Sequence, residues 1–313
     1  MGARRLTVPM PFPTPFYAPL AAGAALGHFA DEGFDVTVTT AGALGKGAVQ
    51  ALLDGDVAIA LSGLMRSLEL ADRGGPLLVH FAEVCRRNGF FLLARRPMPG
   101  FAWPDLAGAT VLSFAEAPTP WQCLLAVLRR HGVDPATVRI DRTRPTAEAV
   151  AAFRAGHGDF LEQAEPVVSA LVAAGAAAVV ASMGEATGPV PFTSYMATPE
   201  FLRRERDAAV RFTRAVARTQ RWLAAHDTSE IARCITAHFP GVPAGTLEGA
   251  VARYRGQDTW ARTPVLDRRG YTALHEILRG GGLIRHPHRY EDLVDASIAS
   301  DALASLDSPS SVS

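Results

Sequence analysis

Side chains able to bind a polar ligand gather in the middle of the chain, near the ends of expected strands. They are Ser113, Glu116, Trp121, Glu162 and Glu165. A buried carboxylate that faces a cleft accepts a hydrogen bond from an amine or a ring N–H, and it rejects analogues that lack this donor. Glu165 precedes Pro166 at an expected helix start, where the helix dipole alone stabilises a carboxylate. The group predicts contact with a nitrogen-bearing ligand, and Glu165 also has a purely structural interpretation.

A proline-rich loop near the start of the chain carries three aromatic side chains, Phe12, Phe16 and Tyr17. Prolines stiffen the loop, and ligands of α/β sheets bind where strands end and helices begin. We therefore expect these rings to stack on a flat ligand. The alternative is that the loop packs against its own part of the protein.

Two further loops lead into expected helices. Thr39 and Thr40 precede a glycine-spaced loop that ends at Lys46, and Ser62 precedes a helix that contains Arg66. Free N–H groups at a helix start favour an anion or a carbonyl group, to which the hydroxyls add hydrogen bonds. Arg66 would clamp an anion bidentately unless it is a surface residue, and Ser62 is the stronger candidate. Lys46 either caps the ligand or lies in solvent.

Catalytic and metal motifs were sought along the whole chain. His286 and His288 flank Pro287, but no third ligand is evident, so a surface turn is favoured over a metal site. The chain has no GxSxG elbow, no Walker A motif and no pair of acids at glycosidase spacing. His28 lies inside an expected helix, where packing is favoured over a role as a base. We expect no cofactor and no metal.

The elements that must position these residues alternate between strand and helix, which predicts a parallel sheet with helices on both faces. In the first half we expect strands at 6–8, 34–40, 57–61, 77–83 and 90–94, and helices at 18–30, 48–53 and 64–72. The pattern then restarts, with strands at 110–113, 138–140, 159–161, 177–181 and 190–197, and helices at 121–131, 147–155 and 165–173. Helices follow at 199–225, 229–238, 243–254 and 271–279, before a tail from residue 300 that we expect to fray. Residues 51–57 resemble residues 152–160, which favours two similar α/β lobes.

Composition excludes several classes of protein. The 313 residues are 48% hydrophobic and carry no formal net charge, so no nucleic-acid partner is expected. The three widely spaced cysteines, Cys85, Cys123 and Cys234, predict buried thiols rather than disulfides or a zinc site. No apolar stretch is long enough to span a bilayer, and prolines 9 to 19 argue against a signal helix. We expect either a cytoplasmic protein or an exported one whose signal was removed.

Several stretches together resemble a known family. They are residues 16–20 (FYAPL), 27–36 (GHFADEGFDV), 48–52 (AVQAL), 55–58 (GDVA), 105–111 (DLAGATV), 156–159 (GHGD), 165–166 (EP) and 290–295 (YEDLVD). In order and spacing they resemble the ABC-transporter solute-binding proteins for sulfonates, nitrate and thiamine-pyrimidine precursors. The resemblance covers nearly the whole chain.

The resemblance implies an α/β, two-lobed type II periplasmic-binding-protein fold, with a mixed sheet in each lobe, flanking helices and a helical C-terminal part. Chain crossings are then expected near residues 86–91 and 187–193. Lobe one would comprise residues 1–88 and 190–300, lobe two residues 89–189, and residues 301–313 a flexible tail. The family also implies a monomer, a membrane permease as partner, and a periplasmic or cell-surface location.

One branch of this family is enzymatic. Its members carry a motif similar to L-K-x-x-x-H after the third strand, and the lysine of this motif holds a pyridoxal phosphate. Here Ser62 replaces that lysine and Arg66 replaces the histidine, and residues 188–194 lack the cysteines of that branch. Without a Schiff-base lysine that chemistry has no attachment point. We therefore expect a protein that is not an enzyme and that closes by a hinge over a small, flat, nitrogen-containing ligand such as a pyrimidine. The alternatives are a binder of a small anion such as a sulfonate, and a cytoplasmic enzyme on the same fold.

Overall fold

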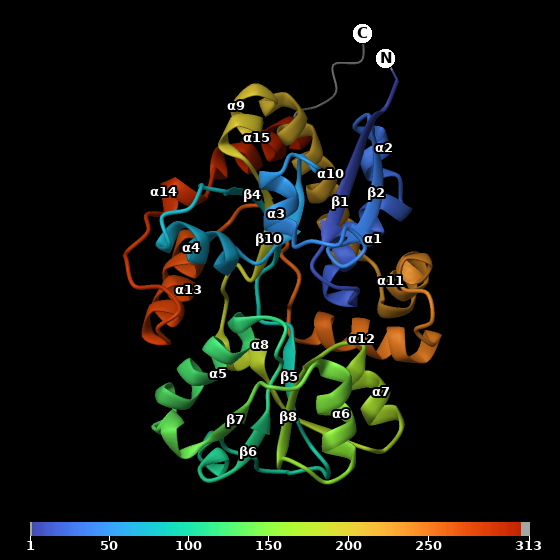
Figure 1. Cartoon of the computed structure of the whole chain (residues 1–313). Coiled ribbons are helices and arrows are strands. Elements are labelled where there is room, and N and C mark those ends of the chain that lie inside the picture. The colour runs from blue at the N-terminus through green and yellow to red at the C-terminus, as the bar shows by residue number, and fades with distance from the viewer. Residues whose placement is uncertain (1, 308–313) are drawn as a thin grey trace.

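Two groups of β-strands build the protein, one above the other in Figure 1. The structure is a computed structural model and describes residues 2–307. The upper group, called lobe one, holds a parallel pair, β1 (Arg4–Met10) with β2 (Phe34–Thr40), and a second sheet in the order β3 (Ala60–Ser62), β10 (Thr193–Ala197), β4 (Val79–Cys85). Around these strands lie η1 (Pro15–Tyr17), α1 (Ala18–Ala25), α2 (His28–Asp31), α3 (Ala48–Leu53), α4 (Leu64–Asp72), α9 (Pro199–Arg204), α10 (Arg206–Ala225), α11 (Thr228–Ile235), η4 (Thr236–His238), α13 (Arg268–Gly280), α14 (Tyr290–Leu293) and α15 (Ala296–Asp307).

The lower group, called lobe two, is built on one five-stranded sheet. Its order is β7 (Arg139–Asp141), β6 (Thr110–Leu112), β8 (Phe160–Ala164), β5 (Phe90–Ala94), β9 (Ala178–Ser182). β6 is parallel to both of its neighbours, and β5 is antiparallel to both of its own, so the sheet is mixed. Flanking it are η2 (Trp103–Leu106), α5 (Pro118–Arg130), η3 (Pro135–Thr137), α6 (Thr146–Arg154), α7 (Val167–Ala173) and α8 (Met183–Thr187). Helix α12 (Ala244–Gly256) packs on α11 of lobe one and on α7 of lobe two.

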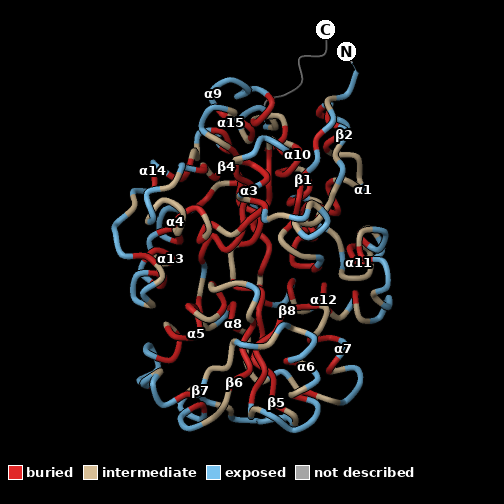
Figure 2. Tube along the Cα trace, in the orientation of Figure 1, coloured by how far each residue is buried: buried red, intermediate tan, exposed pale blue. Residues whose placement is uncertain are grey.

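Three chain segments meet where the lobes join. The segment after β4 leads to β5, and the segment after α8 returns to β10. They are hydrogen-bonded to each other, from Val190 N to the Arg86 carbonyl and from Phe192 N to the Cys85 carbonyl, both at 2.9 Å. The third segment follows α12, where Arg86 N donates to the Thr259 carbonyl. One contiguous hydrophobic core runs through both lobes, and Figure 2 shows the central strands as buried. Which residues move together remains a prediction.

The mixed α/β architecture confirms the predicted fold class, and three local expectations were wrong. The helix expected at 18–30 is broken at Gly27, whose φ of 76° lies in the left-handed region. The parallel sheet expected from strand–helix alternation does not form around β3 and β4, because β10 returns from lobe two and inserts between them antiparallel to both. The tail expected to be flexible from residue 301 is helical to Asp307, since α15 packs on α10. Residues 308–313 of that expected tail lie outside the described residues.

A buried histidine ties α4 to the sheet of lobe one. His80 on β4 is fully buried, and its ring nitrogens contact the Ser67 hydroxyl on α4 at 2.8 Å and the Ser194 hydroxyl on β10 at 2.6 Å. Burial lowers the pKa of His80 to about 3, because the interior disfavours the charged imidazolium. The folded protein therefore holds this histidine neutral.

Acid should weaken the fold through His80. A histidine whose pKa is lower in the folded state stabilises the fold fully above its unfolded pKa near 6.5, and this contribution is lost as the pH falls toward 3. We expect the free energy of unfolding to fall by roughly 1.4 kcal/mol per pH unit from this group across that window. Urea titrations between pH 7 and 4 should show a shallower pH slope for His80→Gln. An unchanged slope would contradict the assignment.

Candidate functional site

A cavity of about 660 Å³ lies between the two lobes. Lobe one contributes the loop after β1, the first turns of α3 and α4 and the start of β10, and lobe two contributes the start of β5 and the segment 116–120. Small-molecule sites typically measure about 300–1,000 Å³, so this cavity suits one small ligand. The lining residues are Pro11, Phe12, Phe16, Tyr17, Ala41, Gly47, Ala48, Val49, Gln50, Ser62, Gly63, Met65, Arg66, Glu69, Leu70, Arg73, Phe90, Glu116, Ala117, Thr119, Pro120, Phe192 and Thr193.

The structure brings only half of the predicted site residues to this cavity. Those that line it are Phe12, Phe16, Tyr17, Ser62, Arg66 and Glu116. Those that lie outside its lining are Thr39, Thr40, Ser113, Trp121, Glu162 and Glu165. Ligand contact through this second group stays a prediction.

The aromatic loop after β1 forms one wall of the cavity. Thr14 caps the short helix η1, where its hydroxyl oxygen accepts from Phe16 N at 3.2 Å. The same hydroxyl donates to the Glu165 carbonyl of lobe two at 2.6 Å. The rings of Phe16 and Tyr17 lie 5.3 Å apart and are almost fully buried, and the Phe12 ring lies 5.5 Å from Phe114 of lobe two. These rings pack against neighbouring rings and also border the cavity, so the packing interpretation is supported and stacking on a ligand stays a prediction.

Three buried groups fix the backbone of this loop at the junction of the lobes. The Phe16 carbonyl accepts from the Trp260 indole at 3.0 Å and from the Cys85 thiol at 3.2 Å. Gly89 lies so close to the Phe16 ring that a Cβ there would come within 2.4 Å of a ring carbon. The loop is therefore held rigidly before any ligand enters.

Helix α4 brings the charged side of the cavity. Arg66, Glu69 and Arg73 all line it. Arg73 pairs with Glu69 at 2.5 Å, and Arg66 lies 3.8 Å from the same carboxylate. Arg66 also donates across the lobes to the backbone carbonyl of Glu116, at a long 3.4 Å. Arg66 is therefore positioned to exchange a weak contact for a stronger anionic partner.

Glu116 has a structural partner of its own. Its Oε1 accepts from the backbone N–H of Thr146 at 2.8 Å, at the first residue of α6. A carboxylate at a helix start is stabilised by the helix dipole. This interaction therefore connects the loop that precedes α5 with the start of α6. The predicted amine contact must then compete with this bond.

Ser113 and Glu162 meet inside lobe two. The Ser113 hydroxyl donates to Glu162 Oε2 at 2.5 Å, and Glu162 is fully buried on β8. Burial raises the pKa of Glu162 to about 7, against the opposing effects of the Ser113 hydrogen bond and the Arg142 charge. The other oxygen, Oε1, has no hydrogen-bond partner among the described residues.

Arg142 covers Trp121 beside this carboxylate. The guanidinium lies 4.4 Å from the centre of the Trp121 ring, a cation–π contact, and its buried Nε has no partner in the part of the chain described. Burial lowers the pKa of Arg142, and the Glu162 charge opposes this effect. Sequence analysis missed Arg142, although its position directly after β7 was a usable signal.

Glu165 is held by partners outside the cavity. Its carboxylate accepts from Ser169 N at 2.8 Å and from Arg253 of α12 at 3.0 Å, and its own N–H donates to the Tyr254 hydroxyl at 3.1 Å. Burial raises the pKa of Glu165, while these donors act in the opposite direction. The structural interpretation of Glu165 therefore has direct support. The stabilising positive charge, however, comes from Arg253 of α12 and not from the helix dipole that the sequence suggested.

The loop after β2 makes internal contacts. The Thr40 hydroxyl accepts from Ala43 N at 3.2 Å, which closes the turn. Lys46 pairs with Asp54 at 2.6 Å and with Asp56 at 2.7 Å on the protein surface, and it does not line the cavity, which agrees with the solvent alternative.

The His286-Pro287-His288 stretch is hydrogen-bonded to Asp72, the last residue of α4. Asp72 accepts from His286 N at 2.8 Å and from His288 Nε2 at 3.1 Å. Burial would raise the pKa of Asp72, but hydrogen bonds from the backbone of His286 and Arg285 outweigh it and lower the value to about 2. Residues 2–307 contain no cluster of three His, Cys, Asp or Glu residues placed to hold a metal ion. His28 contacts the Thr219 hydroxyl at 2.9 Å, which agrees with the packing role expected for it.

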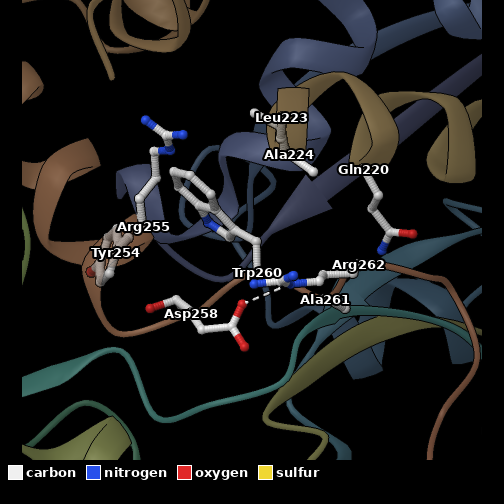
Figure 3. Close-up of a pocket in the computed structure, with 10 residues that line it drawn as sticks. Gln220, Leu223, Ala224, Tyr254, Arg255, Asp258, Trp260, Ala261 and Arg262 are labelled. Atoms are coloured by element: carbon white, nitrogen blue, oxygen red, sulfur yellow. Dashed lines mark hydrogen bonds and ion pairs between the residues drawn. The ribbon is translucent and has the colours of Figure 1, made fainter. Parts of the chain in front are cut away.

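A second, smaller cavity of about 170 Å³ lies at the junction of the lobes (Figure 3). Trp260 and Tyr254 line it together with Asp258, which pairs with Arg86 at 3.3 Å and with Arg262 at 3.1 Å. Its volume falls below the range of about 300–1,000 Å³ that is typical of small-molecule sites.

Comparison with known proteins now identifies the family. Residues 14–229 match the family described as NMT1/THI5 like. The chain belongs to the NMT1/THI5-like family. The putative binding protein YtlA of Bacillus subtilis (strain 168) is 31% identical over 286 residues, covering 91% of this chain and 85% of YtlA.

Solved structures agree on the fold. The alkanesulfonate-binding protein SsuA from Xanthomonas axonopodis pv. citri, bound to MOPS, aligns with a TM-score of 0.71 at 17% identity, over 95% of this chain and 99% of SsuA. The desulfurization enzyme DSZB aligns with a TM-score of 0.69 at 17% identity, over 97% and 99% of the two chains. These matches confirm the periplasmic-binding-protein fold, and the family match together with YtlA confirms the resemblance found in the sequence. In the described residues 2–307, no helix has the length and apolar character that crossing a membrane requires.

The contact between Gly89 and Phe16 can be tested directly. Gly89→Ala would place a Cβ 2.4 Å from the ring, so the ring must shift, and we expect a loss of about 1–3 kcal/mol in the free energy of unfolding. Gly256→Ala, whose Cβ would meet nothing within 4 Å, is the matched control. Adding Phe16→Leu to Gly89→Ala should recover part of the loss, since the smaller side chain makes room. Additive losses in urea denaturation would contradict the contact.

Proposed function

We propose that this protein is a solute-binding protein of an ABC importer, and that its cleft takes a flat aromatic solute carrying an acidic group. The observation that carries the proposal is the lining of the larger cavity. Aromatic rings from both lobes form its walls, and among the described residues the guanidinium of Arg66 makes only two long contacts, 3.4 Å to the Glu116 carbonyl and 3.8 Å to the Glu69 carboxylate. An apolar pocket with few polar groups is typical of small-molecule sites, and an arginine fork suits a carboxylate or a sulfonate.

The relatives support this class of function. YtlA is named a putative binding protein, and SsuA is an alkanesulfonate-binding protein. We propose that lobe one, residues 1–88 with 190–300, and lobe two, residues 89–189, close on the ligand about the crossings. A membrane permease would then recognise the closed form, with the protein working as a monomer in the periplasm or at the cell surface.

A nitrogen heterocycle is the second candidate ligand, and Glu162 is the observation in its favour. A fully buried carboxylate with an unpartnered oxygen gains from a donor such as a ring N–H. Glu162 lies outside the cavity lining, so this ligand requires Trp121 and Arg142 to move aside. The arrangement present in the structure therefore favours the acidic solute.

Catalysis on the same fold has weaker support. The described residues that line the cavity include no histidine, cysteine or lysine. Cys85 is buried behind the aromatic loop, and burial raises the pKa of its thiol well above the usual range, which opposes formation of a nucleophilic thiolate. DSZB shows that the fold can carry an enzyme, so recovery of the bound solute unchanged after incubation is the direct check.

A thermal-shift panel tests the ligand class. Aromatic sulfonates and carboxylates should raise the melting temperature, because a ligand that binds only the folded state stabilises it by about 2.7 kcal/mol at 100 times its Kd. Arg66→Gln should weaken their binding by about 10- to 100-fold through the loss of a charge-assisted hydrogen bond. Arg203→Gln, an exposed arginine on α9, is the control and should change nothing. A panel in which only pyrimidines give shifts would overturn the acidic-solute proposal.

The heterocycle candidate makes a separate prediction about pH. A ring N–H donor binds best to ionised Glu162, whose pKa lies at about 7, so affinity for a neutral pyrimidine should rise as the pH increases from 6 to 8. Glu162→Gln should weaken binding and remove this pH dependence, as measured by isothermal titration calorimetry. Pyrimidine binding that keeps its pH dependence in Glu162→Gln would exclude Glu162 as the contact.

A further inference from the structure

Gln122 has an amide with no hydrogen-bond partner in the interior of the protein. Its side chain is 1% exposed, and neither Oε1 nor Nε2 has a partner within residues 2–307. Gln122 lies near the start of α5, two residues beyond Pro120, which lines the cavity. An amide buried without partners carries an unrecovered desolvation cost, so this position calls for an explanation.

The residue facing Gln122 belongs to the other lobe. Helix α5 of lobe two packs on α13 of lobe one, and Gly281 follows the last turn of α13. A Cβ at Gly281 would lie 1.4 Å from Gln122 Oε1 and 2.6 Å from its Cδ. The amide is therefore pressed against bare backbone at the lobe boundary, where only glycine leaves room for it.

The desolvation cost of the Gln122 amide disappears when water can reach it, because water supplies the missing hydrogen bonds. Separating α5 from α13 exposes Gln122 to solvent, where both amide atoms form hydrogen bonds. Bringing the helices together removes that water and supplies no replacement. The arrangement in the structure, with α5 packed on α13, thus carries a desolvation cost that an arrangement with the two helices apart would lack.

We propose that Gln122 biases the ligand-free protein toward an open arrangement of its lobes. The inference rests on the proposed function only in that the lobes move as a hinge, and it does not depend on which solute binds. The bias keeps the cleft accessible, and binding energy from the solute then drives closure. Without Gln122, the closed form would be populated before a solute enters.

Spin labels on the two lobes can measure this bias directly. Leu77 of lobe one is 43% exposed and Met98 of lobe two is 38% exposed, so cysteines there should accept labels. Cys234→Ser removes the partly accessible native thiol, while Cys85 and Cys123 are buried. Electron-electron distance measurements on the ligand-free protein then report the proportions of open and closed forms, and small-angle scattering on unlabelled protein provides a second readout.

Two substitutions should move the balance in opposite directions. Gln122→Leu keeps the volume and removes the polar atoms, and we expect the closed-to-open ratio to rise about tenfold, which corresponds to about 1.4 kcal/mol. Gly281→Ala should push α5 from α13 and lower the closed population, because its φ of −88° accepts alanine and only the contact with Gln122 is disturbed. The double variant Gln122→Ala with Gly281→Ala should relieve this clash.

Controls separate the bias from general damage to the fold. Gly245→Ala places a Cβ in open space on α12 and should leave the distances unchanged. Gln122→Met repeats the removal of polar atoms if the leucine variant melts at a lower temperature than the unsubstituted chain. Folded Gln122→Leu and Gln122→Met proteins with the same distance distribution as the unsubstituted chain would overturn the proposal. That result would leave the ligand-class proposal intact, since the measurement uses no ligand.

Discussion

The backbone carbonyl of Phe16 is the point on which the geometry of the cleft depends. It accepts hydrogen bonds from Trp260 and from Cys85, which belong to two different segments at the junction of the lobes. The loop that it fixes also reaches lobe two through the Thr14 hydroxyl. Because buried donors left unpaired are costly, these bonds hold the loop in place whenever the junction is intact. The aromatic wall of the cavity therefore depends on the junction of the lobes and not on the cleft surface alone.

Buried acids in this protein show how similar residues acquire different roles. Glu32, within the stretch that carries the family resemblance, is buried and pairs with Arg214 and Arg218 of α10, so its role is to hold lobe one together. Glu165 likewise joins α12 to lobe two through Arg253. Of these three acids, Glu162 has an oxygen without a hydrogen-bond partner in residues 2–307, and burial raises its pKa to about 7. An acid becomes a candidate for ligand binding when its environment leaves it unsatisfied, and the residue type does not reveal that.

Alternation of strand and helix signals predicted the α/β class and most of the elements, because each depends on local periodicity. It could not predict that β10 inserts between β3 and β4, since that pairing joins segments far apart in the chain. The same limit applies to the site. Ser62 at the end of β3 and Arg66 in the first turn of α4 reach the cavity, whereas Glu162 lies within a strand, where the direction of the side chain depends on register. Arg142 was missed because its partner Trp121 lies on a helix 21 residues earlier in the printed sequence.

In the proposed mechanism, closure requires that the ligand supply contacts between the lobes that the protein itself lacks. The lobes already touch through the Arg66 and Thr14 hydrogen bonds, through the Phe12 and Phe114 rings and where α5 packs on α13. Against them stands the unpartnered amide of Gln122 at the same boundary. A ligand changes the balance only by its differential affinity for the two forms, so a solute that contacts both Arg66 and lobe two is favoured over one that contacts a single lobe. Selectivity and closure then arise from the same contacts, because a solute that fails to bridge the lobes leaves the desolvation of Gln122 uncompensated.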